Sequence, residues 1–352
     1  MSTIIKTKVK FNLRDKFGDF WEGTTKSQRI VFRVLLIGFF YTFPFITTPL
    51  IATTESDFSS VLFYPMAMYA IMAIGLNIIV GKSGILDLGY VAFFAIGAYT
   101  HAIMSLYFGT PFWLNVALGM GFAMIAGVTL GVPALRLRGD YLAIITLGFG
   151  EIVRIVALNL NVTGGAAGLA GIPAPPSIFG VEFLVDDPKP FYWLVLTMTL
   201  LVVWAYLRLT SRRPGRAWEA IREDEDVAEL MGVPTFKYKL WGFVMGGAVG
   251  GVAGALYSAQ VTSIVPELFT LNVSIMILAC VVFGGMGNIW GVAFGAALLG
   301  YLPEKLRFLS DTRILIFGLL MVVMMNVRPD GLIPRKKREK IYDKDTGASI
   351  SR

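Results

Sequence analysis

The chain has 352 residues, of which 55% are hydrophobic and only 16% charged, a balance that excludes an ordinary soluble protein and indicates an integral membrane protein. Its net charge of +7 does not indicate a nucleic-acid partner, because the basic residues lie between and beyond the apolar segments. The single histidine, His101, and the single cysteine, Cys280, exclude an intramolecular disulfide and a His/Cys metal site.

Long apolar segments recur along the chain, and we expect each to form a membrane-spanning helix, because backbone inside a bilayer must satisfy its own hydrogen bonds. The predicted fold is therefore all-α, a polytopic transmembrane bundle of about ten spans, some of them short or broken. The predicted spans are 30–51, 61–80, 89–107, 113–132, 141–160, 191–209, 238–261, 273–286, 288–303 and 313–327. The segments 273–286 and 288–303 are short, so they form either two spans or one re-entrant hairpin.

The distribution of lysine and arginine predicts three regions and an orientation. Residues 1–29 and 328–352 are strongly basic and flank the transmembrane domain at 30–327, which includes a charged connecting segment at 210–237. Basic residues concentrate on the cytoplasmic side of membrane proteins, so we expect a multi-pass protein of the cytoplasmic (inner) membrane with both termini in the cytoplasm. Within 1–29, an apolar face at helical spacing, formed by Leu13, Phe17, Phe20 and Trp21, predicts an interfacial helix, and the alternative is a disordered tail.

Two glycine-rich interruptions break the apolar sequence, one at Gly81–Gly89 and one at Gly284–Asn288. Broken helices expose peptide dipoles, and paired breaks in the two halves of a chain indicate a transport pathway. The predicted topology runs both segments in the same direction. The sequence therefore suggests a parallel internal repeat whose two breaks line a pathway.

Ionisable residues inside a span are costly, and Glu151 with Arg154 is the clearest case. At i and i+3 the two side chains share one helix face and can pair. They form either a structural ion pair or part of a polar pathway lining. In the second case their predicted companions are Asn77, Asp87, Tyr90 and Thr146. Asp87 has a simpler alternative as a solvated loop carboxylate.

Two further stretches have a defined structural expectation. The extracytoplasmic loop at 161–190 contains five prolines after position 172, so a helix through it is not expected, and it forms a rigid lid or a docking surface. Glycines at four-residue spacing between Gly242 and Gly254 predict close helix contacts, either deep in the bundle or at a subunit interface.

The stretch 212–232 is the most distinctive polar part of the chain. Its apolar positions follow helical spacing, and the acidic run Glu223–Asp226 breaks it into two short helices. Such a segment either docks a cytoplasmic partner or is a solvated connection.

Several of these motifs, in this order, resemble the branched-chain amino acid permeases of ABC importers, in particular the LivM-type subunit. The resemblance covers nearly all of 60–334. The matching stretches are 75–81, 87–99, 137–152, 163–165, 215–225, 284–288 and 328–334.

This resemblance implies a non-enzymatic transport subunit that forms a heterodimer with a LivH-type permease. It implies two ABC ATPases on the cytoplasmic face, which use ATP and Mg²⁺, an extracytoplasmic solute-binding protein, contacts with membrane lipids and no cofactor on this chain. The implied ATPase-coupling residues are Gly215, Arg216, Glu219, Ala220, Arg222, Asp224, Glu225 and Gly232. Alternative functions are a urea or amide importer of the same type and an autonomous secondary transporter.

Overall fold

The computed structural model describes residues 35, 38–45, 58–137, 139–177, 180–183, 187–305, 312–328, 331–333, 341–342 and 349–350. The chain divides into two compact units, Met1–Pro49 and Leu50–Arg352. In the first unit, helical residues at 38–42 lead into the 3₁₀ turn η1 (Phe43–Phe45). The predicted interfacial helix and most of the predicted span 30–51 lie outside the described residues.

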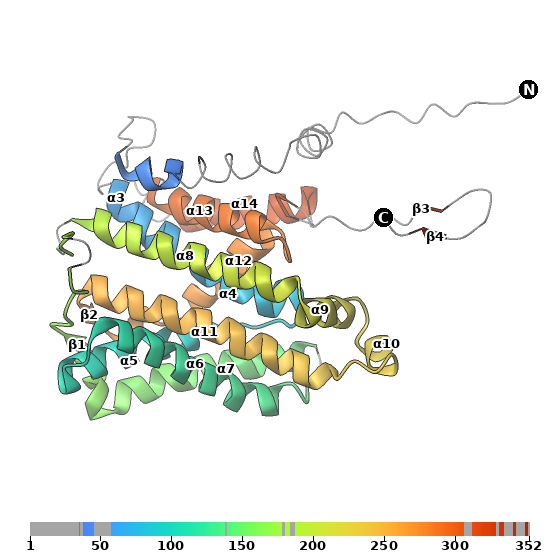
Figure 1. Ribbon diagram of the computed structural model, residues 1–352, viewed down its shortest axis with the longest axis horizontal. Coiled ribbons are helices and arrows are strands. Elements are labelled where there is room, and N and C mark those ends of the chain that lie inside the picture. The colour runs from blue at the N-terminus through green and yellow to red at the C-terminus, as the bar shows by residue number, and fades with distance from the viewer. Residues whose placement is uncertain are drawn as a thin grey trace, which may run out of the picture. The chain divides into compact units, whose positions relative to one another are not determined.

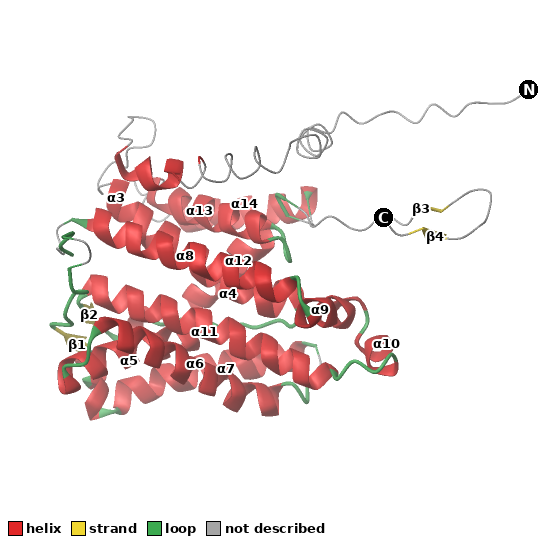
Figure 2. Cartoon of the chain, viewed as in Figure 1, coloured by secondary structure: helices red, strands yellow, loops and turns green. Residues whose placement is uncertain are grey.

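The second unit is almost entirely helical wherever it is described (Figure 2). Its longer helices are α4 (Met68–Leu76) with the π-helical turns η2 (Leu62–Ala67) and η3 (Asn77–Lys82) at its ends, α5 (Val91–Phe108), α6 (Phe112–Ala134), α7 (Asp140–Asn159), α8 (Pro188–Thr210), α11 (Thr235–Val261), α12 (Leu271–Gly284), α13 (Ile289–Lys305) and α14 (Thr312–Val327). The shorter ones are α3 (Phe58–Val61), η4 (Asn161–Thr163), η5 (Gly165–Ala167), α9 (Arg213–Glu223), α10 (Glu225–Leu230) and η6 (Pro266–Leu268).

Strands are confined to two short antiparallel pairs in the described ranges. The first joins β1 (Leu169–Ala170) to β2 (Ser263–Ile264), and the second joins β3 (Ile341–Tyr342) to β4 (Ser349–Ile350). The predicted all-α class is therefore confirmed.

Seven helical segments of the described chain are long and apolar enough to cross a membrane. They are 62–82, α5, α6, α7, α8, α11 and 266–284. The last two helices, α13 and α14, have 17 and 16 residues, or about 24 to 26 Å at 1.5 Å per residue, slightly less than the hydrocarbon thickness. Helices thus occupy nine of the ten predicted spans, and α12 and α13 form two separate helices joined by a short break.

Helix α11 lies at the centre of the bundle, against α5 and α6. A Cβ on Gly97 of α5 would stand 2.0 Å from the carbonyl oxygen of Gly251, and one on Gly254 would stand 2.0 Å from that of Phe94. Only glycine permits backbones to approach this closely. The predicted glycine stripe therefore serves packing deep inside the bundle of this chain.

The two ends of the bundle carry different structures. Helices α9 and α10 lie at one end, and the β1–β2 pair lies at the other (Figure 1). At the β1–β2 end, the amide of Ile172 donates to the carbonyl of Thr262 at 2.9 Å, which ties the long loop to the end of α11. In its described part this loop has the one-turn helices η4 and η5 and the short strand β1, and no helix of greater length forms before α8 begins at Pro188.

Candidate transport pathway and coupling site

The first glycine-rich break is a non-helical segment, 83–90, between η3 and α5. The amide of Leu88 donates to Thr146 Oγ1 at 3.0 Å, and the amide of Gly89 donates to Asp87 Oδ1 at 2.9 Å. Thr146 lies six residues, or about 9 Å, beyond the start of α7. The segment therefore carries irregular backbone well into the depth of the bundle, with α7 lying against it.

The second break, 285–288, joins α12 to α13. The amides of Leu332 and Ile333 donate to the carbonyls of Phe283 and Gly284 at 2.8 and 3.2 Å, and Asn288 Nδ2 donates to the carbonyl of Ile333 at 3.0 Å. The residues after α14 thus provide partners for carbonyls at the end of α12, which an α-helix leaves unsatisfied. This gives the motif at 328–334 a structural role.

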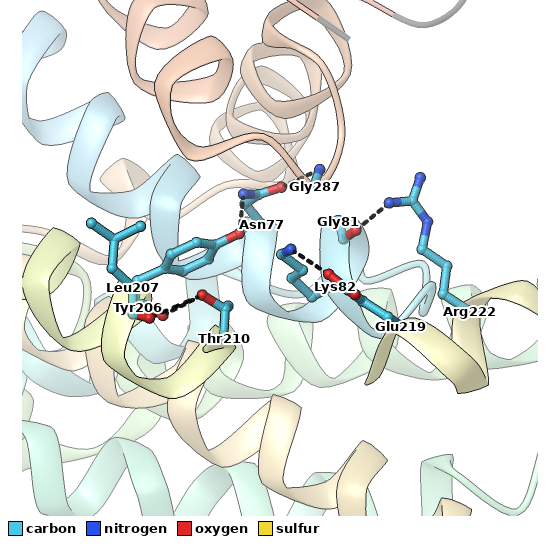
Figure 3. Close-up of polar contacts among 9 residues, drawn as sticks. All are labelled: Asn77, Gly81, Lys82, Tyr206, Leu207, Thr210, Glu219, Arg222 and Gly287. Carbon is cyan, nitrogen blue, oxygen red and sulfur yellow. Dashed lines mark hydrogen bonds and ion pairs between the residues drawn. The ribbon is translucent and has the colours of Figure 1, made fainter. Parts of the chain in front are cut away.

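The side chain of Asn77 connects η3, the helical turn that leads into the first break, to the second break. Asn77 is fully buried, its Oδ1 accepts from the amide of Gly287 at 2.8 Å, and its Nδ2 donates to the hydroxyl of Tyr206 on α8 at 3.1 Å (Figure 3). A Cβ on Gly81 would stand 1.8 Å from Asn77 Oδ1 and 2.6 Å from the Gly287 nitrogen. We call Asn77, Gly81, Tyr206 and Gly287 the Asn77 junction. It fixes η3 to the second break and to α8.

The connecting segment folds into two helices, as the acidic run predicts. Asp224 separates α9 from α10, and its Oδ1 accepts from the amide of Val227 at 3.0 Å as the N-cap of α10. Helix α9 buries Trp218, whose Nε1 donates to the carbonyl of Tyr238 at 2.7 Å. Helix α9 is therefore packed onto the membrane domain and is not a solvated connection.

Ion pairs and hydrogen bonds join these short helices to the bundle. Lys82 Nζ lies 3.1 Å from Glu219 Oε1, and the guanidinium of Arg222 donates to the carbonyl of Gly81 (Figure 3). Glu225 at the start of α10 pairs with Lys239 of α11. The Lys82 side chain is only 9% exposed, so the carboxylate of Glu219 offsets the cost of burying its charge. Helix α9 is thus attached directly to the end of η3.

The end of α10 presents an apolar tip. Leu230 and Met231 are 87% and 80% exposed, and Val227 is also exposed. The same helix exposes two acidic residues, Asp226 and Glu229, and Gly232 follows it with a φ of +83°. We call Val227, Leu230 and Met231 the α10 tip.

The remaining predicted coupling residues lie on or beside α9. Gly215 is buried, and a Cβ there would stand 2.0 Å from the carbonyl oxygen of Thr210. Arg216 is exposed, and Ala220 is partly buried. The assignment of these residues to ATPase coupling stays a prediction.

The Glu151–Arg154 pair forms as predicted, with Arg154 Nε 2.8 Å from Glu151 Oε2. Glu151 also borders a narrow crevice beside the first break. Its lining residues are Leu88, Val91, Leu147, Gly150, Glu151 and Leu271.

The predicted pathway residues gather at two locations. Asp87 and Tyr90 belong to the first break, Thr146 and Glu151 of α7 lie beside it, and Asn77 lies at the junction. Tyr90 is buried and donates to the carbonyl of Gly246 of α11 at 2.9 Å. Asp87 is also completely buried, so its interpretation as a solvated loop carboxylate is wrong.

Comparison with known proteins identifies the family. The profile of the family described as "Branched-chain amino acid transport system / permease component" matches residues 59–325, which span the described bundle from α3 to α14. The chain belongs to this permease family. It is therefore a multi-pass permease of the inner membrane and a transport subunit.

Individual members of the family are also similar. The permease LivM of the high-affinity branched-chain amino acid transport system of Escherichia coli (strain K12) is 39% identical, over 89% of this chain and 76% of the relative. A probable LivM of Methanocaldococcus jannaschii is 27% identical over 80% of this chain and 94% of the relative. The permease LivH of Escherichia coli (strain K12) is 28% identical over 78% and 93%. No solved structure matches the chain.

Several contacts of this permease site were not predicted from the sequence, although Gly287 and Lys82 lie in the two predicted interruptions. Tyr206 lies 129 positions from Asn77, and Gly287 lies 210 positions from it. Ser274 accepts from the amide of Val91 at 3.0 Å through its Oγ, which joins α12 to the start of α5. Lys82 gave a signal of its own, as a basic residue directly after a long apolar segment.

Proposed function

We propose that this chain is one of two permease subunits of an ATP-driven importer of branched-chain amino acids, with a LivH-type permease as its partner. Membership of the permease family supports this, as do the names of its LivM and LivH relatives. The single observation that carries the ATP-driven part is the α10 tip, which exposes Leu230 and Met231 at one end of the bundle.

The α10 tip is the proposed contact for an ABC ATPase. Large apolar side chains this exposed are unfavourable in water, and the exposed acidic residues of the same helix suit a groove with a basic rim. ATP and Mg²⁺ would be bound by two ATPase chains, and this chain would bind no cofactor. Helix α9 would then carry motion of the tip to the membrane domain, through Lys82–Glu219 and Arg222–Gly81.

The proposed mechanism is alternating access. Closure of the ATPase pair would displace α9, and α9 would move the end of η3 because the two are directly bonded. The Asn77 junction would pass this displacement to the second break and to α8. Both broken segments would therefore move together, which is the requirement for opening one side of a pathway while closing the other.

The α9–α10 end is the proposed cytoplasmic side, with both termini on that side. The β1–β2 end would then face outward, where the loop before α8 would receive a solute-binding protein. Basic residues concentrated in 1–29, 210–237 and 328–352 support this orientation.

The decisive experiment is mass spectrometry of the complex purified from native membranes in mild detergent. We expect a second permease and two ATPases to accompany this chain. Replacing Leu230 and Met231 together by aspartate should release the ATPases and retain the second permease. The matched control is Val162→Asp, an exposed apolar residue at the opposite end, which should retain both. Recovery of this chain without ATPases in a complex-preserving preparation would refute the proposal.

The cargo needs a separate measurement. The complex, reconstituted in liposomes with its binding protein, should accumulate leucine, isoleucine and valine when ATP is supplied on the α10 side. Accumulation of urea or an amide instead of these amino acids would identify the alternative cargo.

A further inference from the structure

We propose that α7, α12 and the first break form the surface that meets the second permease, and that the crevice on it is this chain's wall of the solute pathway. We call this surface the α7–α12 face, defined by Leu88, Leu147, Glu151, Leu271 and Ile275. The inference rests on the proposed function, since it names where the permease partner binds.

The first observation is charge in the middle of a span. Glu151 lies eleven residues, or about 16 Å, beyond the start of α7, whose 20 residues give a length of about 30 Å. The side chains of Glu151 and Arg154 are 35% and 26% exposed in this chain. Charged groups at this depth face protein or water, because exposing them to hydrocarbon is costly even when they are paired.

Two other exposed helices carry no charged residue at the corresponding depth. Helix α6 over its whole length, and α8 between Phe191 and Leu207, contain no charged residue. Their exposed surfaces carry large apolar side chains: Trp113, Met120, Phe122, Ile125, Leu201 and Trp204. Such uncharged apolar surfaces are suited to contact with lipid. The contrast separates lipid-facing helices from α7.

The second observation is the irregular backbone behind the crevice. Non-helical backbone at membrane depth is tolerated where protein buries it or where it borders a water-filled cavity. Leu88 and Val91, at the end of the first break, line the crevice together with Leu271 of α12 and Glu151. The crevice is therefore an apolar surface with a carboxylate at its edge, which the second permease would complete as a pathway wall.

The occupant opposite this face must itself span the membrane. The exposed stripe of α7 continues from Tyr141 through Ile144 to Ile155, along most of the helix. Water beside Glu151 would need a second protein wall to separate it from lipid. A permease of the same family supplies a wall of matching length with its own broken segments, and the similarity to LivH shows that this family includes such a second type of chain.

Site-specific photocrosslinking in the intact complex tests the partner. Benzoylphenylalanine replaces Ile144 on α7 or Ile275 on α12, and the controls carry it at Phe122 on α6 or Leu201 on α8. We expect the first two positions to crosslink to the second permease and the controls to crosslink to lipid alone. Lipid-only products at both test positions would overturn the proposal, and so would permease products at the controls. Crosslinks between two copies of this chain would overturn the identity of the partner.

The same preparations separate this inference from the proposed function. Co-purification before irradiation shows whether a second permease is present, so absence of the partner refutes the proposed function, while its presence without crosslinks refutes only the assigned face.

Thiol labelling tests the pathway wall. Cys280 is the only native cysteine and is fully buried, so an introduced Leu147→Cys or Phe122→Cys provides the accessible thiol. A water-soluble methanethiosulfonate should modify Leu147→Cys in the assembled complex at least tenfold faster than Phe122→Cys. Equal rates, or an unreactive Leu147→Cys, would show that the crevice does not face water.

Discussion

Gly81→Ala should disconnect the two broken segments. The new methyl group would stand 1.8 Å from Asn77 Oδ1 and 2.6 Å from the Gly287 nitrogen, inside the hydrogen bond that joins them. Asn77 must therefore swing away, and the backbone at Gly287 must shift by about 0.4 Å to reach even a 3.0 Å contact. The carbonyl of Gly81 that accepts from Arg222 is unchanged by the substitution.

The expected cost follows from the bond that is lost. A buried amide left without its acceptor costs about 1 to 3 kcal/mol. The higher helix propensity of alanine returns at most about 1 kcal/mol at this helical position. Subtracting the full 1 kcal/mol leaves a net destabilisation of about 0 to 2 kcal/mol, to which the steric shift adds its own cost. We also expect a larger loss of transport, because both breaks would no longer move as one body.

The measurements are thermal denaturation of the purified complex and leucine uptake per ATP hydrolysed in liposomes. The matched control is Gly121→Ala in α6, where a Cβ meets nothing within 4 Å. The melting temperature of Gly81→Ala should fall by a few degrees. If Gly81→Ala and Gly121→Ala were equally stable and equally active, the Asn77 junction would have no role in coupling.

Further substitutions test the packing and the attachment of α9. Gly97→Ala brings a Cβ to 2.0 Å from a backbone carbonyl oxygen of α11, so it should lower the free energy of unfolding by on the order of 1 to 3 kcal/mol. Gly121→Ala, with open space around it, should leave the thermal stability unchanged. Lys82→Met and Glu219→Gln form a double-mutant cycle, measured on uptake per ATP hydrolysed. The coupling between them should be non-zero but at most about 1 kcal/mol, because Glu219 is 35% exposed and solvent screens the ion pair. Strictly additive effects would exclude a direct role for the pair. Trp218→Phe removes the hydrogen bond to α11 and should increase protease cleavage within 212–232, and unchanged cleavage would argue against α9 being held by that bond.

The contacts form a continuous route from the α10 tip to both breaks. Helix α10 follows α9 directly, α9 is bonded to η3, and η3 is bonded through Asn77 to the second break. The first step is the chain itself, and the others are hydrogen bonds or an ion pair between defined atoms. Under the proposed mechanism, this route would let a displacement at one end of the bundle reach the middle without requiring the large helices to bend.

The amino-acid sequence by itself determined the membrane class, the position of nearly every helix and the two breaks. Apolar runs of spanning length can only be helices in a bilayer, and glycine with polar residues interrupts them in a recognisable way. The acidic run at 223–226 likewise predicted the separation of α9 from α10. These features are local, so neighbouring residues are sufficient to encode them.

The tertiary structure alone decided how these features meet. Nothing near Asn77 in the sequence indicates that its amide contacts Gly287 and Tyr206, because both partners lie more than a hundred residues away. Burial of Asp87 likewise depends on α7 lying across a segment that looks like a cytoplasmic loop. Glu219 and Glu225 resembled surface charges for a partner, yet both pair with lysines of this chain. Pairing and burial depend on which helices pack together, and a single sequence does not specify that choice residue by residue.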